Sequence, residues 1–168
     1  MQNAKTTVGR NVNVDLVGHA EQVPAKVDTG ADSSSVWASN VVILPNGTLN
    51  FVLFDTESQF YDGKTIETNE YTVAMVRSST GHQEIRYRVI LPVRIKGRRI
   101  KAAFNLSNRS RNLYPILIGR RTLSEKFIVD VTMADNKDSV TDSKSKTLNN
   151  ELILNPYAFY SKYHGNDQ

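Results

Sequence analysis

Asp28-Thr29-Gly30-Ala31-Asp32 is the run of residues that says most about the architecture of this chain. An acidic residue followed by a small hydroxyl residue and a glycine is what a carboxylate-based hydrolase places at the floor of its cleft. Gly30 permits a tight backbone turn, and the Thr29 hydroxyl can both donate and accept hydrogen bonds. The same residues can also form an ordinary acidic turn without chemistry, since Asp and Gly are common turn residues.

The Asp-Thr-Gly tripeptide occurs only once in the chain, which constrains its chemistry. A carboxylate pair that activates water must share one proton, because two carboxylates about 3 Å apart cannot both ionise. The nearest second copy, Asp55-Thr56-Glu57, lacks the glycine. If Asp28 is catalytic, the second carboxylate must come from another copy of the chain. The sequence therefore ties catalysis to a homodimer.

The residues around this run, up to about residue 130, read as short strands and turns with very little helix. Val12, Val14 and Leu16 alternate with polar residues, a period of two that suits a half-buried strand. A turn at Gly18-His19 leads into a second strand that ends at Asp28. These signals predict a strand-rich domain.

Two hairpins are expected in the middle of the chain. The first has arms over Tyr71–Arg77 and Glu84–Leu91, which flank a polar tip. The second spans Val93–Lys101 and alternates apolar and basic residues around Gly97. Turn residues between alternating arms are typical of antiparallel pairs.

A continuous apolar run, Pro115–Gly119, is typical of a strand buried on both faces. A short helix over 122–126 and a strand over 127–129 should follow it. Composition then changes at Thr132, where Asp, Asn, Ser, Thr and Lys replace most apolar residues. This change marks the end of the strand-rich domain.

The chain therefore divides into a domain over 1–131, a polar linker over 132–150 and an apolar C-terminal tail over 151–168. The tail should pack on the domain or on its mate. An alternative is that the tail lies in a cleft as a substrate-like segment, because such clefts bind extended apolar strands. Trp37 is expected in the core or at the edge of a dimer.

Composition restricts the class of protein. With 39% apolar and 23% charged residues, the chain is globular rather than disordered. No apolar run approaches the roughly 18 residues of a membrane span, so no membrane contact is expected. The absence of cysteine excludes disulfides and thiolate metal sites. The protein is cytoplasmic if Met1 is its native start, and in the envelope or secreted if a leader was removed.

Basic residues are concentrated in one segment, from Arg77 to Arg121. Twelve Lys or Arg stand there against Glu84 alone, so the segment carries +11 and the rest of the chain −7, for a total of +4. The simpler interpretation is that long basic side chains line the exposed faces of strands. The alternative is a basic surface that attracts an acidic partner, an acidic substrate or nucleic acid. Nucleic acid is the less favoured partner, because no nucleic-acid module is recognisable.

A second motif favours a catalytic role for the Asp28 run over an ordinary acidic turn. The apolar stretch that ends in Ile118-Gly119-Arg120, taken with Asp28-Thr29-Gly30-Ala31, resembles the retropepsin-like aspartic protease family. The resemblance covers roughly residues 8 to 131 and includes the order of hairpins, helix and last strand. It implies an all-β, closed barrel-like domain with one short helix, followed here by a C-terminal extension.

The resemblance is closest to the cellular bacterial and archaeal branch, which is often labelled as putative ATP-dependent zinc proteases. The chain has no phosphate-binding glycine loop followed by Lys and Ser or Thr, and no His-Glu-x-x-His motif. Its histidines, His19, His82 and His164, fall in separate turns and the tail. We therefore expect no metal and no cofactor.

The resemblance also implies roles for particular residues. Asp28 from each of two subunits forms the catalytic dyad, with Thr29 bracing the two loops and Gly30 completing the motif. Asp32 and Arg120 form a structural ion pair behind the cleft. The residues implied to bind substrate are Ala31, Asp32, Leu117 and the hairpin-tip residues Ser79, Thr80, Gly81 and His82.

The expected function is an aspartic endopeptidase that hydrolyses extended peptide or protein substrates through a water activated by the dyad. The tip of the first hairpin carries only one glycine, whereas the viral members have a glycine-rich tip. This departure and the basic segment keep open a non-catalytic module that binds peptides or an acidic partner on the same fold.

Overall fold

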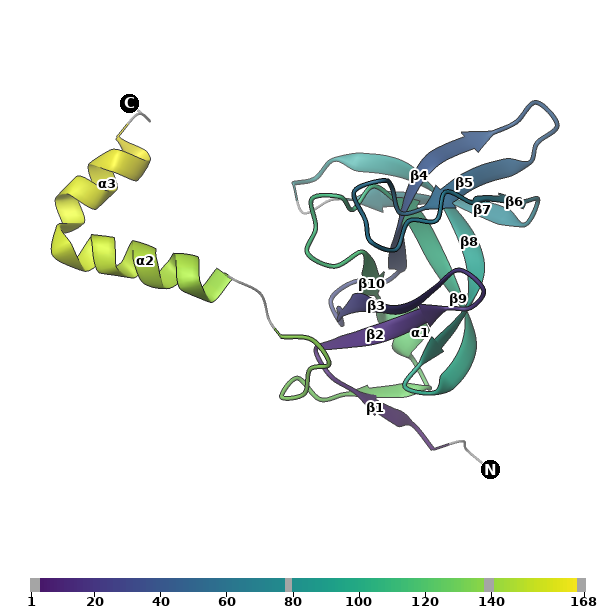
Figure 1. Ribbon diagram of the computed structural model, residues 1–168, viewed down its shortest axis with the longest axis horizontal. Helices are drawn as coiled ribbons and strands as arrows, with labels where there is room; N and C mark the ends of the chain where they lie inside the picture. The colour runs from purple at the N-terminus through teal and green to yellow at the C-terminus, as the bar shows by residue number, and fades with distance from the viewer. Residues whose placement is uncertain (1–3, 78–79, 138–140, 166–168) are drawn as a thin grey trace. The chain divides into compact units, whose positions relative to one another are not determined.

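The computed structural model describes residues 4–77, 80–137 and 141–165 (Figure 1). The chain forms two compact units, Met1–Asn136 and Lys137–Gln168. The first unit is strand-rich and carries the Asp28 run, while the second is helical.

The first unit contains eleven strands and one short helix among the described residues. In chain order these are β1 (Thr6–Val8), β2 (Asn11–Leu16), β3 (Ala20–Val27), β4 (Ser34–Ile43), β5 (Leu49–Leu53), β6 (Thr65–Thr68), β7 (Tyr71–Arg77), β8 (Gln83–Ile95), β9 (Arg98–Ser107), β10 (Ile116–Ile118), α1 (Arg120–Leu123) and β11 (Phe127–Val129).

Six strands close into a barrel. They follow the order β10-β3-β2-β8-β9-β4, and the ring closes because Ile116 of β10 also pairs with Val36 of β4. Apolar side chains fill the interior, and Val14, Val23 and Phe104 are fully buried. The expected all-β, closed barrel-like domain with one short helix is confirmed. Trp37 is also buried against the core, as expected.

The long strand β8 is shared by both expected hairpins. Its first part pairs with β7, from Gln83 to Val89, and its later part pairs with β9 as far as Ile95. The second hairpin turns at Lys96-Gly97, where both residues have a positive φ. Both hairpins are therefore confirmed, although residues 78–79 at the tip of the first lie outside the described residues.

The strand β10 lies between β3, to which it is parallel, and β4, to which it is antiparallel. Ile116 and Ile118 are fully buried, which confirms the expected buried strand. The helix α1 that follows begins at Arg120, earlier than the expected start at residue 122. It also ends earlier than residue 126, because the backbone leaves helical geometry at Ser124, with ψ of 133°, and Glu125 then adopts a left-handed φ of 65°.

The first unit extends past the expected boundary at residue 131, as far as Asn136. After β11 has paired in parallel with β1, the chain crosses the start of β2. The Asn136 amide donates to Asn11 Oδ1 at 2.7 Å, and its side chain donates to Asn13 Oδ1 at 2.9 Å. Residues 132–136 are therefore part of the domain, because side-chain hydrogen bonds hold their polar residues in place.

The second unit consists of α2 (Thr141–Leu154) and α3 (Pro156–His164). The structure differs here from the expected polar linker over 132–150, because α2 runs across the expected boundary with the 151–168 tail. Residues 156–164 of the expected tail are likewise helical rather than extended. Glu151 joins the two helices by accepting from Lys162 Nζ at 2.5 Å and Tyr163 Oη at 3.0 Å.

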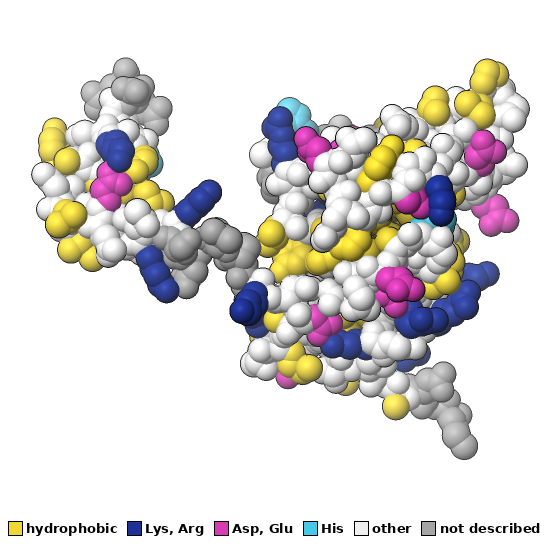
Figure 2. Space-filling view, in the orientation of Figure 1, with side chains coloured by type: hydrophobic (Ala, Val, Ile, Leu, Met, Phe, Trp, Pro, Cys, Tyr) yellow, Lys and Arg dark blue, Asp and Glu magenta, His cyan; other side chains and the backbone are white. Residues whose placement is uncertain are grey.

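Local signals explain why this segment folds as helices although it lacks an apolar stripe. The side chain of Asn155 accepts a hydrogen bond from the Ala158 amide at 3.0 Å, and Pro156 occupies the first turn of α3. Figure 2 shows hydrophobic side chains on the surface of this unit, among which Leu154 and Tyr157 are strongly exposed. None of the helices in the described ranges is long and apolar enough to span a membrane.

Candidate active site

The Asp28 carboxylate is held at the point where β3 ends beside β10. The Asp28 amide donates to the carbonyl of Ile118 at 2.9 Å, which joins the two strand ends. Oδ1 of Asp28 then accepts hydrogen bonds from the backbone amides of Gly30 at 3.0 Å and Ala31 at 3.2 Å. The side chain is 30% exposed, and its Oδ2 lies 4.0 Å from Lys26 Nζ. One carboxylate oxygen is thus fixed by the backbone, while the group as a whole stays open to a ligand.

The Gly-Arg turn packs directly against the Asp28 loop. A Cβ at Gly119 would lie 2.5 Å from the carbonyl oxygen of Ser33 and 3.0 Å from that of Ala31, so only glycine fits. The Gly119 amide donates to the buried Ser34 Oγ at 3.0 Å. The Arg120 amide donates to the Ala31 carbonyl at 2.8 Å. The two motifs that are distant in sequence therefore form one rigid loop pair.

The ion pair expected between Asp32 and Arg120 is present in a weaker form than expected. Arg120 Nη2 lies 3.8 Å from Asp32, whereas Arg121 Nε lies 2.9 Å from it. The Arg120 guanidinium instead donates to the carbonyls of Gly30 at 2.7 Å and Thr29 at 3.2 Å. Arg120 thus braces the backbone of the tripeptide, and Arg121 is the closer partner of Asp32. The sequence reasoning missed both roles.

A cleft of about 570 Å³ opens beside the loop, between it and the hairpin of β7 and β8. Of the residues expected at the substrate site, Ala31, Asp32 and Leu117 line this cleft together with Gly30. Thr80, Gly81 and His82 are exposed in the hairpin turn and are not part of the lining, and Ser79 lies outside the described residues. The exposed Thr29 also lies outside the lining.

Arginines dominate the lining of the cleft. Five of them contribute to it, while Asp32 is the one acidic residue in the described lining; the arginines are Arg77, Arg86, Arg88, Arg109 and Arg121. All five belong to the basic segment noted in the sequence. The density of cations in that segment could be seen in the sequence, but only the closed barrel shows which of its twelve cations line the same cleft.

Arg109 is half-buried in this cleft, as are Arg86 and Arg88. Its Nε donates to the carbonyl of Tyr114 at 2.9 Å. Burial lowers the pKa of Arg109, and so does the neighbouring Arg86 guanidinium, while the charge of Asp28 acts in the opposite direction. Arg109 therefore lies within electrostatic reach of both the Asp28 carboxylate and a second cation. A negatively charged ligand between the two guanidinium groups would relieve their repulsion.

The three histidines of the chain belong to different elements. His19 lies in the turn between β2 and β3, His82 precedes β8, and His164 ends α3. Within the described ranges, no group of three or more His, Asp or Glu side chains is arranged to hold a metal ion.

The closed barrel, the Asp-Thr-Gly loop and the Gly-Arg turn packed behind it define the class: this is the single-lobed fold of the retropepsin-like aspartic proteases, with one catalytic-type loop per chain. Within that class, the chain belongs to the RimB-like family. The family model, described as retropepsin-like aspartic endopeptidase RimB, matches residues 7–139. The family resemblance expected from the sequence is thereby confirmed.

Curated relatives carry a different kind of name. A probable alpha-L-glutamate ligase of Desulfotalea psychrophila is 25% identical over 111 residues, and one of Shewanella pealeana is 30% identical over 111 residues. Each alignment covers 64% of this chain and 24% of the relative. The chain thus spans about a quarter of the length of these ligases.

A solved structure shares the fold. The crystal structure of the Legionella pneumophila protein Lpg0085, described as having unknown function, superposes with a TM-score of 0.60 at 26% identity. The match covers 78% of this chain and 97% of that one.

Proposed function

We propose that the protein is an aspartic endopeptidase whose catalytic dyad consists of Asp28 from two copies of the chain. The observation that carries the proposal is the Asp28 carboxylate, which is 30% exposed and is fixed through Oδ1 by the amides of Gly30 and Ala31, two residues that line the cleft. Membership of the RimB-like family supports the same chemistry. A single loop of this kind per chain is why the proposal requires a homodimer.

In this mechanism the two Asp28 carboxyl groups share one proton. The ionised group removes a proton from water, which attacks the peptide carbonyl, and the protonated group gives its proton to the leaving amine. Thr29, exposed at the surface of each loop, would brace the two loops where they meet. Activity should be greatest on the acidic side of neutrality, because the dyad works with one proton.

The proposed substrates are extended peptide segments rich in acidic side chains, glutamate above all. Five arginines line the cleft; Arg86 is paired with Glu84 and Arg121 with Asp32, and the remaining positive charge favours carboxylate ligands. Among the described residues, Arg88 donates to the neutral groups Ser33 Oγ at 3.1 Å and Asn105 Oδ1 at 2.9 Å, and neither contact neutralises its charge. The names of the ligase relatives also point to glutamate.

The test uses two matched peptides, one rich in glutamate and one with every glutamate replaced by glutamine. Mass spectrometry of the products should show cleavage of the glutamate peptide and little of its partner. Asp28→Asn should abolish this cleavage, while Asp62→Asn, the same change in the loop before β6, should leave it intact. Cleavage by Asp28→Asn would refute the dyad, whereas equal cleavage of both peptides would refute only the substrate class.

The second candidate is a non-catalytic module that binds acidic peptides in the same cleft. The naming of the relatives as glutamate ligases favours it, since a ligase binds and joins its substrates rather than cutting them. Under this alternative the unmodified protein binds the glutamate peptide without cleaving it at any pH. Asp28→Asn would then bind the peptide as tightly as the unmodified protein does.

A further inference from the structure

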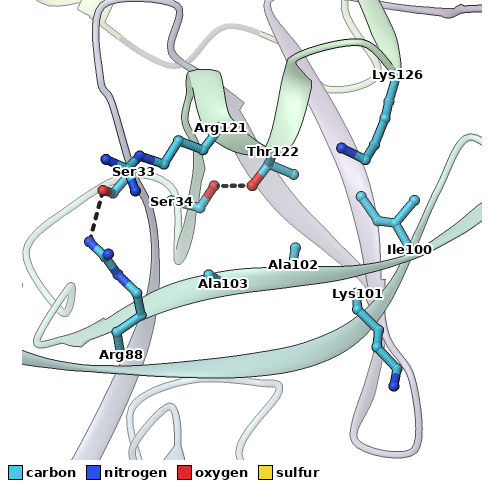
Figure 3. Close-up of a pocket in the computed structure, with 10 residues that line it drawn as sticks. All are labelled: Ser33, Ser34, Arg88, Ile100, Lys101, Ala102, Ala103, Arg121, Thr122 and Lys126. Carbon is cyan, nitrogen blue, oxygen red and sulfur yellow. Dashed lines mark hydrogen bonds between the residues drawn. The ribbon is translucent and has the colours of Figure 1, made fainter. Parts of the chain in front are cut away.

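A separate small cavity lies behind the Asp28 loop, on the side of the loop that packs on β9 and α1 (Figure 3). Its volume is about 120 Å³, enough for several water molecules or one small ion. Its lining shares three residues with the cleft and adds residues of its own. The shared ones are Ser33, Arg88 and Arg121; the others are Ser34, Ile100, Lys101, Ala102, Ala103, Thr122 and Lys126.

The charged groups of this lining are all cations. Figure 3 shows Arg88 and Arg121 near Ser33 at one end and the Lys126 side chain directed inward at the other. Arg121 is paired with Asp32 at 2.9 Å, but the hydrogen bonds described for Arg88 go to neutral groups. Lys126 Nζ lies 3.3 Å from the carbonyl of Ser124, also a neutral acceptor. Positive charge in this cavity therefore exceeds what its own acceptors neutralise.

Two buried hydroxyl groups lie between these ends. Ser34 Oγ and Thr122 Oγ1 are 2.7 Å apart, and the residues are only 1% and 5% exposed. Two hydroxyl groups carry two hydrogens, and their mutual bond uses one of them. Ser34 Oγ accepts from the Gly119 amide, and no acceptor for the second hydrogen is found among the described residues. The pair can thus offer one O–H to a ligand.

We propose that this cavity binds a small oxyanion, either a free anion such as phosphate or a carboxylate of a bound acidic peptide. Arg88, Lys126 and the free hydroxyl hydrogen are the donors, and the described lining contains no carboxylate that would oppose the ligand. Arg121 couples the ligand to Asp32 and so to the Asp28 loop. Ala102 and Ala103 leave the space open because their side chains are short.

The test is a titration of the 168-residue Asp28→Asn chain with inorganic phosphate, followed by the NMR shifts of backbone amides. This readout does not depend on cleavage, so it can fail or succeed independently of the proposed catalysis. The amides of Thr122 and Ala102, which line only the small cavity, should shift on binding. The amide of Ala74, which lines only the cleft, reports whether phosphate binds there instead.

Lys126→Gln should weaken the binding seen at Thr122 by about tenfold, the loss expected for one charged hydrogen bond. Lys101→Gln is the matched control: it removes the same charge from the same lining, but Figure 3 shows that side chain directed away from the cavity. It should change the affinity by less than about twofold. No shift at Thr122, or equal losses in the two variants, would overturn the proposal.

The source of the oxyanion is decided by adding a short glutamate peptide to the phosphate-loaded protein. If the peptide displaces phosphate from the site reported by Thr122, a substrate carboxylate is the ligand. If the peptide binds at the cleft while phosphate remains bound, the ligand is a free anion. Both outcomes require the cavity to be an oxyanion site.

Discussion

The orientation of the Asp28 carboxylate depends on backbone atoms rather than on neighbouring side chains. Its Oδ1 accepts from the amides of Gly30 and Ala31, and the loop that carries those amides is held by the Arg120 amide and guanidinium. A change that moves this backbone should therefore disturb the site even when it alters no charged group.

Gly119→Ala tests this dependence. Its backbone φ of −93° is accessible to alanine, but the added Cβ would lie 2.5 Å from the Ser33 carbonyl oxygen. Because the atoms that the added Cβ would meet are backbone atoms of Ser33 and Ala31, no change of side-chain rotamer can relieve the contact. We expect the free energy of unfolding to fall by about 1–3 kcal/mol. Urea denaturation measures it, and an unchanged midpoint would show that the two loops can separate at little cost.

Arg109→Gln tests the proposal that the substrates are acidic peptides. Arg109 lies in the cleft, within electrostatic reach of Asp28, so its loss should raise KM for a glutamate peptide by about tenfold and leave kcat nearly unchanged. KM for the matched glutamine peptide should stay the same. Arg111→Gln, an exposed arginine of the same loop outside the lining, is the control. An equal effect of both changes would point to general charge rather than to Arg109.

The hairpin of β7 and β8 shows how an element delivers charge to the cleft. Arg86 and Arg88 are two residues apart on β8, so the period of the strand places both on one face. They pair across the hairpin with Ala74 and Thr72, and the small Ala74 leaves room for the cleft. Strand alternation therefore decides which basic residues of β8 face the cleft.

The contact between α2 and α3 should depend on pH. Hydrogen bonds from Lys162 and Tyr163 lower the pKa of Glu151, and the hydrogen bond to Glu151 raises the pKa of Lys162. The contribution of Glu151 is present above its ordinary pKa and is lost as the pH falls through the lowered value. The contribution of Lys162 is lost as the pH rises through its raised value.

A carbon-13 NMR titration of the Glu151 carboxyl group should give a midpoint below that of an ordinary glutamate. Lys162→Met should return the midpoint toward the ordinary value, because the main cause of the lowered pKa is removed. Lys144→Met, at an exposed lysine of α2, should not change it. A Glu151 midpoint that is the same in the unmodified protein and in both variants would contradict the contact between the helices.

At the scale of the whole molecule, the proposed dyad makes activity a property of a pair of chains. When Asp28→Asn chains are mixed with unmodified chains, they should therefore form mixed dimers that are inactive. At about ninefold excess, random pairing leaves about one unmodified chain in ten with an unmodified partner, and activity should fall accordingly. The same excess of an inert, unrelated protein is the control. Activity that is insensitive to the added chains would show that one chain works alone.

Much of the fold could be predicted from local sequence because it depends on local patterns. Alternation predicted the hairpins, and the apolar run around Leu117 predicted the buried β10. The prediction of a polar linker over 132–150 differs from the structure, because non-local contacts rather than a local pattern order the described part of this segment. Residues up to Asn136 are held by hydrogen bonds to Asn11 and Asn13, and α2 is joined to α3 through Glu151, so contacts rather than apolar patterning order both parts.

Neighbouring residues were enough to predict the strand-rich character of the domain and a turn at Asp28-Thr29-Gly30, because strand period and turn chemistry are local, and the family resemblance added the Gly-Arg turn as the partner of that loop. The tertiary structure decided which distant groups meet. It paired Asp32 with Arg121 more closely than with Arg120 and gathered five arginines into one cleft. Those outcomes depend on closure of the barrel through β10 and β4, a contact that no local pattern specifies.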